Sequence, residues 1–178
     1  FADETRLYEK AIAAANRLRP DFVVVCGDLV HHQDDQEELA EVQRVSARLA
    51  PDIPIYFAAG NHDAGNTPPP ESLRLYRERY GADNYSFDNR GVHFVVLNSC
   101  IPFDPSAVMP EWERQVDFLK ADLGRVRAGK GGRIVVFTHH PLFIGNSDDE
   151  DSWLVIPGEQ RRVLLDLLRA HDVSAVFA

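Results

Sequence analysis

Apolar residues recur along the chain with two spacings, one typical of amphipathic helices and the other of short buried strands. The helical spacing predicts helices over residues 3–19, 36–50, 71–81, 110–129 and 158–172. Short β-branched or aromatic runs predict strands over residues 21–28, 53–61, 84–99, 133–141 and 173–178. Because strands alternate with helices, we expect an α/β fold of layered sheets in a single domain spanning residues 1–178.

Two of the strand segments carry further detail. The run over residues 84–99 is interrupted by Asp88-Asn89-Arg90-Gly91, a tight turn that signals a hairpin. The hairpin adds antiparallel strands, so mixed sheets are expected. The run over residues 21–28 is continuous and β-branched, which predicts a strand buried on both faces.

A long connection joins His140 to Gly158 and carries the acidic run 148–151. A loop of this length in a compact domain is more often functional than idle. The acidic run lacks the spacing of an EF-hand loop, so a solvated rim is the stronger interpretation. Trp153 lies in the same loop and is expected to shape a nearby cleft.

Composition narrows the classes of partner. The formal net charge of -9 counts against a long nucleic-acid footprint, although bound metal cations would change the charge locally. No apolar run approaches the ~18 residues of a membrane span, so no membrane partner is expected. Cys26 and Cys100 form no disulfide framework, which favours a cytoplasmic location. The chain begins at Phe1 without a Met, so a targeting segment could have been lost upstream.

Three of the predicted strands end in polar clusters, "CGDLVHH", "AGNHD" and "FTHHP". In open α/β sheets the carboxyl ends of the strands form the ligand crevice. We therefore expect Asp28, Asn61, His62, His139 and His140 to converge. Carboxylate, amide and imidazole groups are the ligand types expected for a divalent metal ion, and no Cys joins them as in a structural zinc site.

His62 stands between Asn61 and Asp63, and a turn alone does not need it. Asn61 offers a neutral oxygen ligand, and Asp63 is a candidate for orienting the neighbouring imidazole. An imidazole beside a metal ion is suited to give a proton to a leaving group. The simpler alternative, a polar turn with structural histidines, explains one Gly-Asn-His-Asp segment but not its two companion clusters.

The motifs "GDLVH", "GNHD" and "HHP", in this order, resemble those of the calcineurin-like metallophosphoesterases. The family pattern runs Asp-x-His, Gly-Asp, Gly-Asn-His-Asp/Glu, His and Gly-His-x-His. The stretches "GNHDAGNTPPPE", "GVHFVVLNS" and "HHPLFIGNSDDEDSW" also resemble the subfamily of calcineurin-like phosphoesterase domain-containing protein 1, described as Ser/Thr protein phosphatases. The resemblance covers essentially the whole chain and implies a layered α-β-β-α sandwich.

By this resemblance, Asp28 would bridge two divalent metal ions, of manganese, iron or zinc. Asn61 and His139 would complete part of the second metal site. His62 would be the catalytic proton donor, and Asp63 would orient it. Two cations at such a centre clamp the phosphoryl oxygens and activate a water molecule for in-line attack.

The family's first and last motifs are absent from the chain. Its first motif should precede the helix over residues 3–19, and Gly-His-x-His should follow Ala178. We therefore expect a fragment whose sandwich is incomplete at both ends. A reduced ligand set holds metal weakly, so these 178 residues alone are predicted to be inactive or nearly so.

Three functions remain open at this point. The leading one is a metal-dependent phosphomonoesterase acting on phosphorylated proteins or small molecules, with His31 and His140 as candidate substrate contacts. A phosphodiesterase or nuclease of the same fold is the second. The third is a catalytically silent binding module, which would apply if the end motifs are missing from the natural protein. The sequence gives no indication of oligomeric state.

Overall fold

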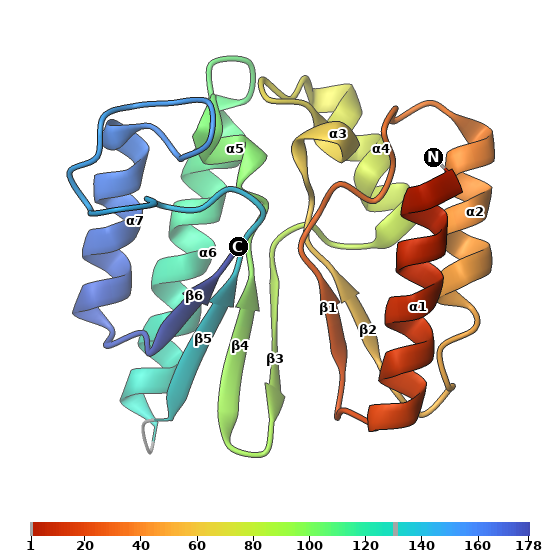
Figure 1. Ribbon diagram of the computed structural model, residues 1–178. Coiled ribbons are helices and arrows are strands. Elements are labelled where there is room, and N and C mark those ends of the chain that lie inside the picture. The colour runs from red at the N-terminus through yellow and green to blue at the C-terminus, as the bar shows by residue number, and fades with distance from the viewer. Residues whose placement is uncertain (1, 130–131) are drawn as a thin grey trace.

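The fold is a sandwich in which two sheets lie between two pairs of helices (Figure 1). The computed structural model describes residues 2–129 and 132–178. One outer layer holds α1 (Ala2–Leu18) and α2 (Gln36–Ser46), and the other holds α6 (Met109–Ala128) and α7 (Gly158–Ala170). The expected α-β-β-α layering is therefore confirmed.

Within the described residues the strands form one sheet of two strands and one of four. The smaller sheet pairs β1 (Val23–Val25) with β2 (Ile55–Phe57) in parallel. The larger sheet has the order β3-β4-β5-β6, from β3 (Tyr85–Asn89), β4 (Val92–Val96), β5 (Arg133–Phe137) and β6 (Ala175–Phe177). The β3–β4 pair is an antiparallel hairpin and the other pairs are parallel, so the sheet is mixed as expected.

The hairpin turn follows from its two central residues. Arg90 and Gly91 both have positive φ, 49° and 79°, which is the backbone of a type I′ turn. This turn matches the right-handed twist of the flanking strands and sets the register that pairs Asn89 with Val92.

Each sheet buries its outer face under helices. Ile12, Val45, Leu49 and Ile53 form a core cluster between the α1–α2 layer and the smaller sheet. The larger sheet packs on α6 and α7 through a second cluster that includes Val95, Ile134, Val136, Leu119 and Leu164. These two cores hold the strand ends, and hence the polar loops that follow them, in place.

The inner faces of the two sheets meet through aromatic rings. Tyr56 stacks on Phe87 with ring centroids 3.8 Å apart, and Phe22 packs edge-on against Phe87 and Phe94. The residues of β1 are half-buried. The expectation that this strand is buried on both faces was therefore wrong, and one reason is that Val25 lines an open cavity between the strand and the helices α1 and α2.

Two short helices in the described residues follow β2 and β4. α3 (Asn61–Ala64) begins directly at the end of the loop after β2, and α5 (Cys100–Phe103) follows β4. α4 (Pro70–Tyr80) begins at a proline, which suits the first position of a helix. No helix in the described part of the chain is long and apolar enough to cross a membrane.

Candidate metal centre

The loops after β1 and β2 approach each other so closely that only glycine fits between them. A Cβ atom on Gly27 would lie 2.7 Å from both the Cα of Gly60 and the Nδ1 of His139. A Cβ on Gly60 would collide with the backbone nitrogen and carboxylate of Asp28. Asp28 itself has φ 52°, a strained conformation for a residue with a side chain. The glycines of the Gly27-Asp28 and Gly60-Asn61 pairs therefore allow the two loops to come into contact.

Asp28, Asn61 and His139 converge at this contact, as the sequence predicts. The Nε2 of His139 lies 2.9 Å from Asn61 Oδ1 and 3.4 Å from Asp28 Oδ1. The other ring nitrogen, Nδ1, lies 2.9 Å from the carbonyl oxygen of Cys26, which can only accept a hydrogen bond. In the neutral imidazole Nδ1 then carries the proton, and the Nε2 lone pair faces two oxygens. Three electron-pair donors around one point suit a cation.

Asp28, Asn61 and His139 account for the ligands of one divalent ion. Among residues 2–129 and 132–178, no group of three or more His, Cys, Asp or Glu side chains is placed to hold a metal ion. The amide of Asn61 is therefore needed as the third ligand beside Asp28 and His139. A second ion would share Asp28, for which the described residues offer no comparable companion set.

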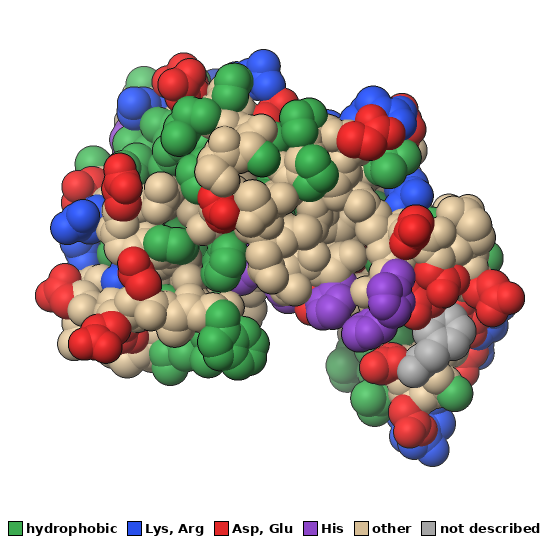
Figure 2. All heavy atoms as spheres, turned by 90° about the horizontal axis from the view of Figure 1, so that it is seen from above, with side chains coloured by type: hydrophobic (Ala, Val, Ile, Leu, Met, Phe, Trp, Pro, Cys, Tyr) green, Lys and Arg blue, Asp and Glu red, His purple; other side chains and the backbone are tan. Residues whose placement is uncertain are grey.

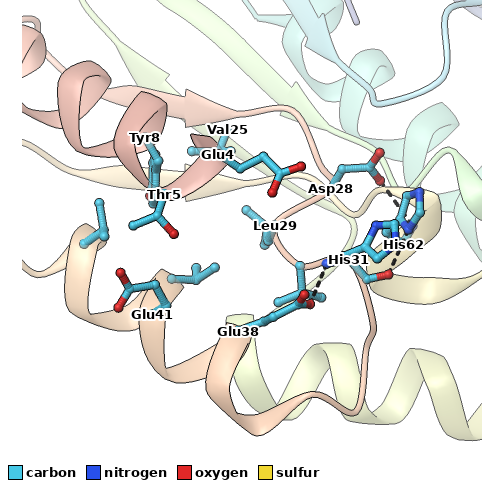
Figure 3. Close-up of a pocket in the computed structure, with 13 residues that line it drawn as sticks. Glu4, Thr5, Tyr8, Val25, Asp28, Leu29, His31, Glu38, Glu41 and His62 are labelled. Atoms are coloured by element: carbon cyan, nitrogen blue, oxygen red, sulfur yellow. Dashed lines mark hydrogen bonds between the residues drawn. The ribbon is translucent and has the colours of Figure 1, made fainter. Parts of the chain in front are cut away.

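His62 lies next to this set, at the start of α3. Its backbone N–H donates to Asp28 Oδ1 at 3.1 Å, and its Nδ1 lies 2.9 Å from the carbonyl oxygen of His31. The two imidazole rings stack with centroids 4.8 Å apart (Figure 3). The backbone of His31 thus orients the His62 ring and leaves its Nε2 available.

The expected contact between Asp63 and the His62 ring is not formed. Asp63 is 2% exposed, and its carboxylate accepts backbone N–H groups of Leu29, Val30 and Gly60 at 2.8–3.2 Å. Burial raises the pKa of Asp63 to about 6, although these hydrogen bonds oppose the shift. The prediction that Asp63 orients His62 directly is corrected: it ties the loop after β1 to the loop after β2.

His140 faces away from open solvent. It is 4% exposed, its ring stacks on Phe103, and its Nδ1 lies 3.0 Å from the hydroxyl of Ser99. Burial and the neighbouring His139 lower the pKa of His140 to about 4, so the ring is neutral at pH 7. His140 does not line the cavity described below, and its role in substrate binding stays a prediction.

Ser99 is the residue of the site whose role sequence reasoning missed. Its Oγ accepts the backbone N–H groups of His139 and His140, at 3.2 and 2.8 Å. With both acceptor positions used, the hydroxyl proton goes to His140 Nδ1. The only signal in the sequence was the position of Ser99 at the end of a strand, which many serines share.

A cavity of about 440 Å³ opens beside Asp28 and His62, between α1, β1 and α2 (Figure 3). Its walls include the carboxylates of Glu4, Glu38 and Glu41. Glu38 accepts the backbone N–H groups of His31 and His32, at 2.7 and 2.9 Å, and so holds the loop after β1. Viewed from above, histidine side chains gather at the edge of a deep hollow between the two halves of the molecule (Figure 2).

A layered α/β sandwich with Asp, Asn and His side chains at its strand ends has the architecture of a phosphoesterase. The chain belongs to the calcineurin-like phosphoesterase family, whose sequence profile matches residues 1–178. It is 34% identical over 184 residues to Serine/threonine-protein phosphatase CPPED1 of Mus musculus and 34% identical over 185 residues to that of Homo sapiens. Each match covers 100% of this chain and 59% of the relative.

More distant relatives are plant purple acid phosphatases. Purple acid phosphatase 21 of Arabidopsis thaliana is 29% identical over 171 residues, covering 89% of this chain and 37% of the relative. The structure of a purple acid phosphatase from yellow lupin (Lupinus luteus) seeds superposes with a TM-score of 0.71 at 17% identity. That superposition covers 97% of this chain and 32% of the lupin chain, and it supports the fold alone.

Proposed function

We propose that this chain forms the core of a metal-dependent phosphomonoesterase that acts on phosphorylated Ser or Thr residues of proteins. The observation that carries the proposal is the convergence of Asp28, Asn61 and His139 from three separate strand ends, with His62 beside them. The relatives named as Ser/Thr phosphatases support the substrate class.

Asp28, Asn61 and His139 would hold a manganese, iron or zinc ion, and a second ion would share Asp28. Such ions, when bound, supply positive charge to the phosphoryl oxygens and make water a better nucleophile. The glycines at positions 27 and 60 keep the ligands together, and Asp63 fixes the two loops that carry them.

His62 would hold a proton on Nε2 and give it to the leaving oxygen as the bond from phosphorus to that oxygen breaks. The Nδ1–H of His62 would donate to the carbonyl oxygen of His31 throughout, so the ring keeps its orientation before and after the transfer. The leaving alcohol is then released neutral, while the water oxygen forms the new bond to phosphorus.

Metal binding and turnover test the proposal separately. The metal-stripped chain is titrated with Co²⁺ or Mn²⁺, followed by absorbance or paramagnetic resonance, beside Asn61→Ala and His139→Ala. We expect about one ion per chain, with affinity at least about tenfold weaker in both variants. Absence of a bound ion would refute the metal centre.

Turnover is measured with an aryl phosphomonoester at high protein concentration, because three ligands predict only residual activity. His62→Ala should lower this metal-dependent rate by about 10²-fold or more without changing metal affinity. Equal rates in the two proteins would refute the proton-donor role. Faster hydrolysis of a bis-ester than of the monoester would instead favour the phosphodiesterase alternative.

A further inference from the structure

The loop over residues 141–157, which directly follows His139 and His140, exposes large apolar side chains to solvent. Exposed fractions are 38% for Phe143, 67% for Ile144, 79% for Trp153 and 41% for Leu154. These four residues are called the apolar platform below. A group of exposed apolar residues beside a candidate active site is typical of an interaction surface.

The loop is held in a defined shape although it has no regular secondary structure. Asp149 accepts the backbone N–H groups of Ile144, Gly145 and Asn146 at 2.8–3.1 Å, and these bonds hold its pKa below the usual value. The base of the loop is closed by a hydrogen bond that the N–H of Ile156 donates to the carbonyl oxygen of Pro141, at 3.1 Å. The platform is therefore presented by a built loop rather than left exposed by a loose one.

A buried arginine supports the loop from below. Arg161 of α7 is 3% exposed, and its guanidinium donates to the carbonyl oxygens of Asp149 and Leu142. Val155 and Ile156 turn inward and are almost fully buried. The same loop thus buries one set of apolar side chains and turns another set outward, which indicates that the outward set has a separate role.

The platform follows the candidate metal centre closely along the chain. Only Pro141 and Leu142 separate His140 from Phe143, and Figure 1 shows the loop running from the end of β5 outward past the upper parts of α6 and α7. A phosphorylated side chain reaching the metal centre would lie in a chain that passes over this loop. An extended peptide gains affinity from a few large apolar contacts of this kind.

The charges around the platform indicate what such a peptide carries. The loop also exposes Asp148, Glu150 and Asp151, and the formal net charge of the protein is -9. Asp151 is engaged with Gly158 N and lies 3.8 Å from Arg161, whereas no ion pair is formed by Asp148 or Glu150 among the described residues. Basic residues of a bound segment would complement these two carboxylates.

We infer that the apolar platform and the carboxylates of Asp148 and Glu150 bind the protein substrate, as an extended segment with apolar and basic residues next to its phosphorylated residue. This inference deepens the proposed phosphatase function and rests on it for the phosphate, but not for the peptide contacts. It assigns substrate selection to a loop outside the metal ligands.

The test measures binding of a fluorescent phosphoserine peptide with Arg and Leu flanking the phosphoserine, in phosphorylated and unphosphorylated forms. Ile144→Ala/Trp153→Ala should weaken binding of both forms by about tenfold or more. Leu18→Ala, which truncates a 72% exposed leucine on the far end of α1, is the matched control and should bind like wild type. Asp148→Asn/Glu150→Gln should weaken binding and reduce its salt dependence.

The outcomes separate this inference from the proposed function. Equal affinity of wild type and the platform variant, or tighter binding of a peptide with Glu in place of Arg, would overturn the platform. If the phosphorylated and unphosphorylated peptides bind equally tightly in the presence of Mn²⁺, while the platform variant weakens binding of both, the proposed function fails and the platform stands. Sedimentation that shows a dimer dissociated by the platform variant would assign the surface to a second copy and also overturn the inference.

Discussion

Replacing Ser99 by Ala removes one oxygen that organises both histidines of the "HHP" motif. In wild type the buried hydroxyl accepts the N–H groups of His139 and His140 and donates to His140 Nδ1. Ser99 is 1% exposed, so water does not readily replace it. The variant leaves two backbone N–H groups and one ring nitrogen without their partner.

The expected cost follows from counting these groups. Each buried donor left unpaired costs about 1–3 kcal/mol, so with two such N–H groups Ser99→Ala should lower the free energy of unfolding by about 2 kcal/mol or more. Release of the His139 backbone also loosens the imidazole that faces Asn61 and Asp28. Groups that orient a ligand in this way typically change metal affinity by 10–100-fold, and a loss of about tenfold is expected here.

Ser46→Ala is the matched control. The Ser46 hydroxyl also makes two contacts, with Val42 O at 2.6 Å and the Tyr8 hydroxyl at 2.8 Å, but it lies on α2 away from the candidate ligands. Urea unfolding followed by circular dichroism gives stability, and Co²⁺ titration gives affinity. If Ser99→Ala loses stability but binds Co²⁺ as tightly as Ser46→Ala, the link from Ser99 to His139 is wrong.

Three further predictions concern the loop contact, a helix and a buried acid. Gly60→Ala should lower Co²⁺ affinity by at least about tenfold, because its Cβ meets Asp28; unchanged titration curves would refute the required close approach. Gly124→Ala in α6, where a Cβ meets nothing within 4 Å, should raise the free energy of unfolding by about 0.5–1 kcal/mol in urea denaturation. Burial alone would raise the pKa of Asp122, but hydrogen bonds from His93 and Arg125 lower it below its usual value. A lowered pKa stabilises the fold above about pH 4 and loses that effect as pH falls further, so Asp122→Asn should cost about 2 kcal/mol at pH 7 and progressively less below pH 4.

Periodicity was sufficient to place the longer helices and the hairpin, but not the short helices α3 and α5. The prediction of a helix over residues 110–129 differs from α6 by one residue at each end, because a proline near its start and apolar spacing mark both ends. The strands are shorter than predicted, since residues such as Cys26 and Ala58 continue the apolar pattern after the ladder has ended. The hydrophobic pattern indicates which residues are buried, and buried residues continue beyond those that pair with a neighbouring strand.

The convergence of Asp28, Asn61 and His139 was predictable, but the contacts that each side chain makes were not. Asp28, Asn61 and His139 follow strands that end at one side of the molecule, so topology alone brings them together. The partner of each side chain depends on the path of the loops instead. Adjacent Asp63 points back to the loop after β1, whereas His31, far away in the sequence, supplies the carbonyl oxygen that orients His62.

The hydrogen bonds that Asp63 and Glu38 accept also explain why the loop after β1 tolerates the strained backbone of Asp28. Asp63 and Glu38 together accept four of its backbone N–H groups, those of residues 29 to 32. Charge-assisted hydrogen bonds that these N–H groups donate to the two carboxylates outweigh a strain of about 1–3 kcal/mol. Strain at Asp28 places its carboxylate against Asn61 and His139, and the position of the His31 carbonyl sets the His62 ring. The two acidic residues thereby determine the ligand geometry and the orientation of the proposed proton donor without contacting a substrate.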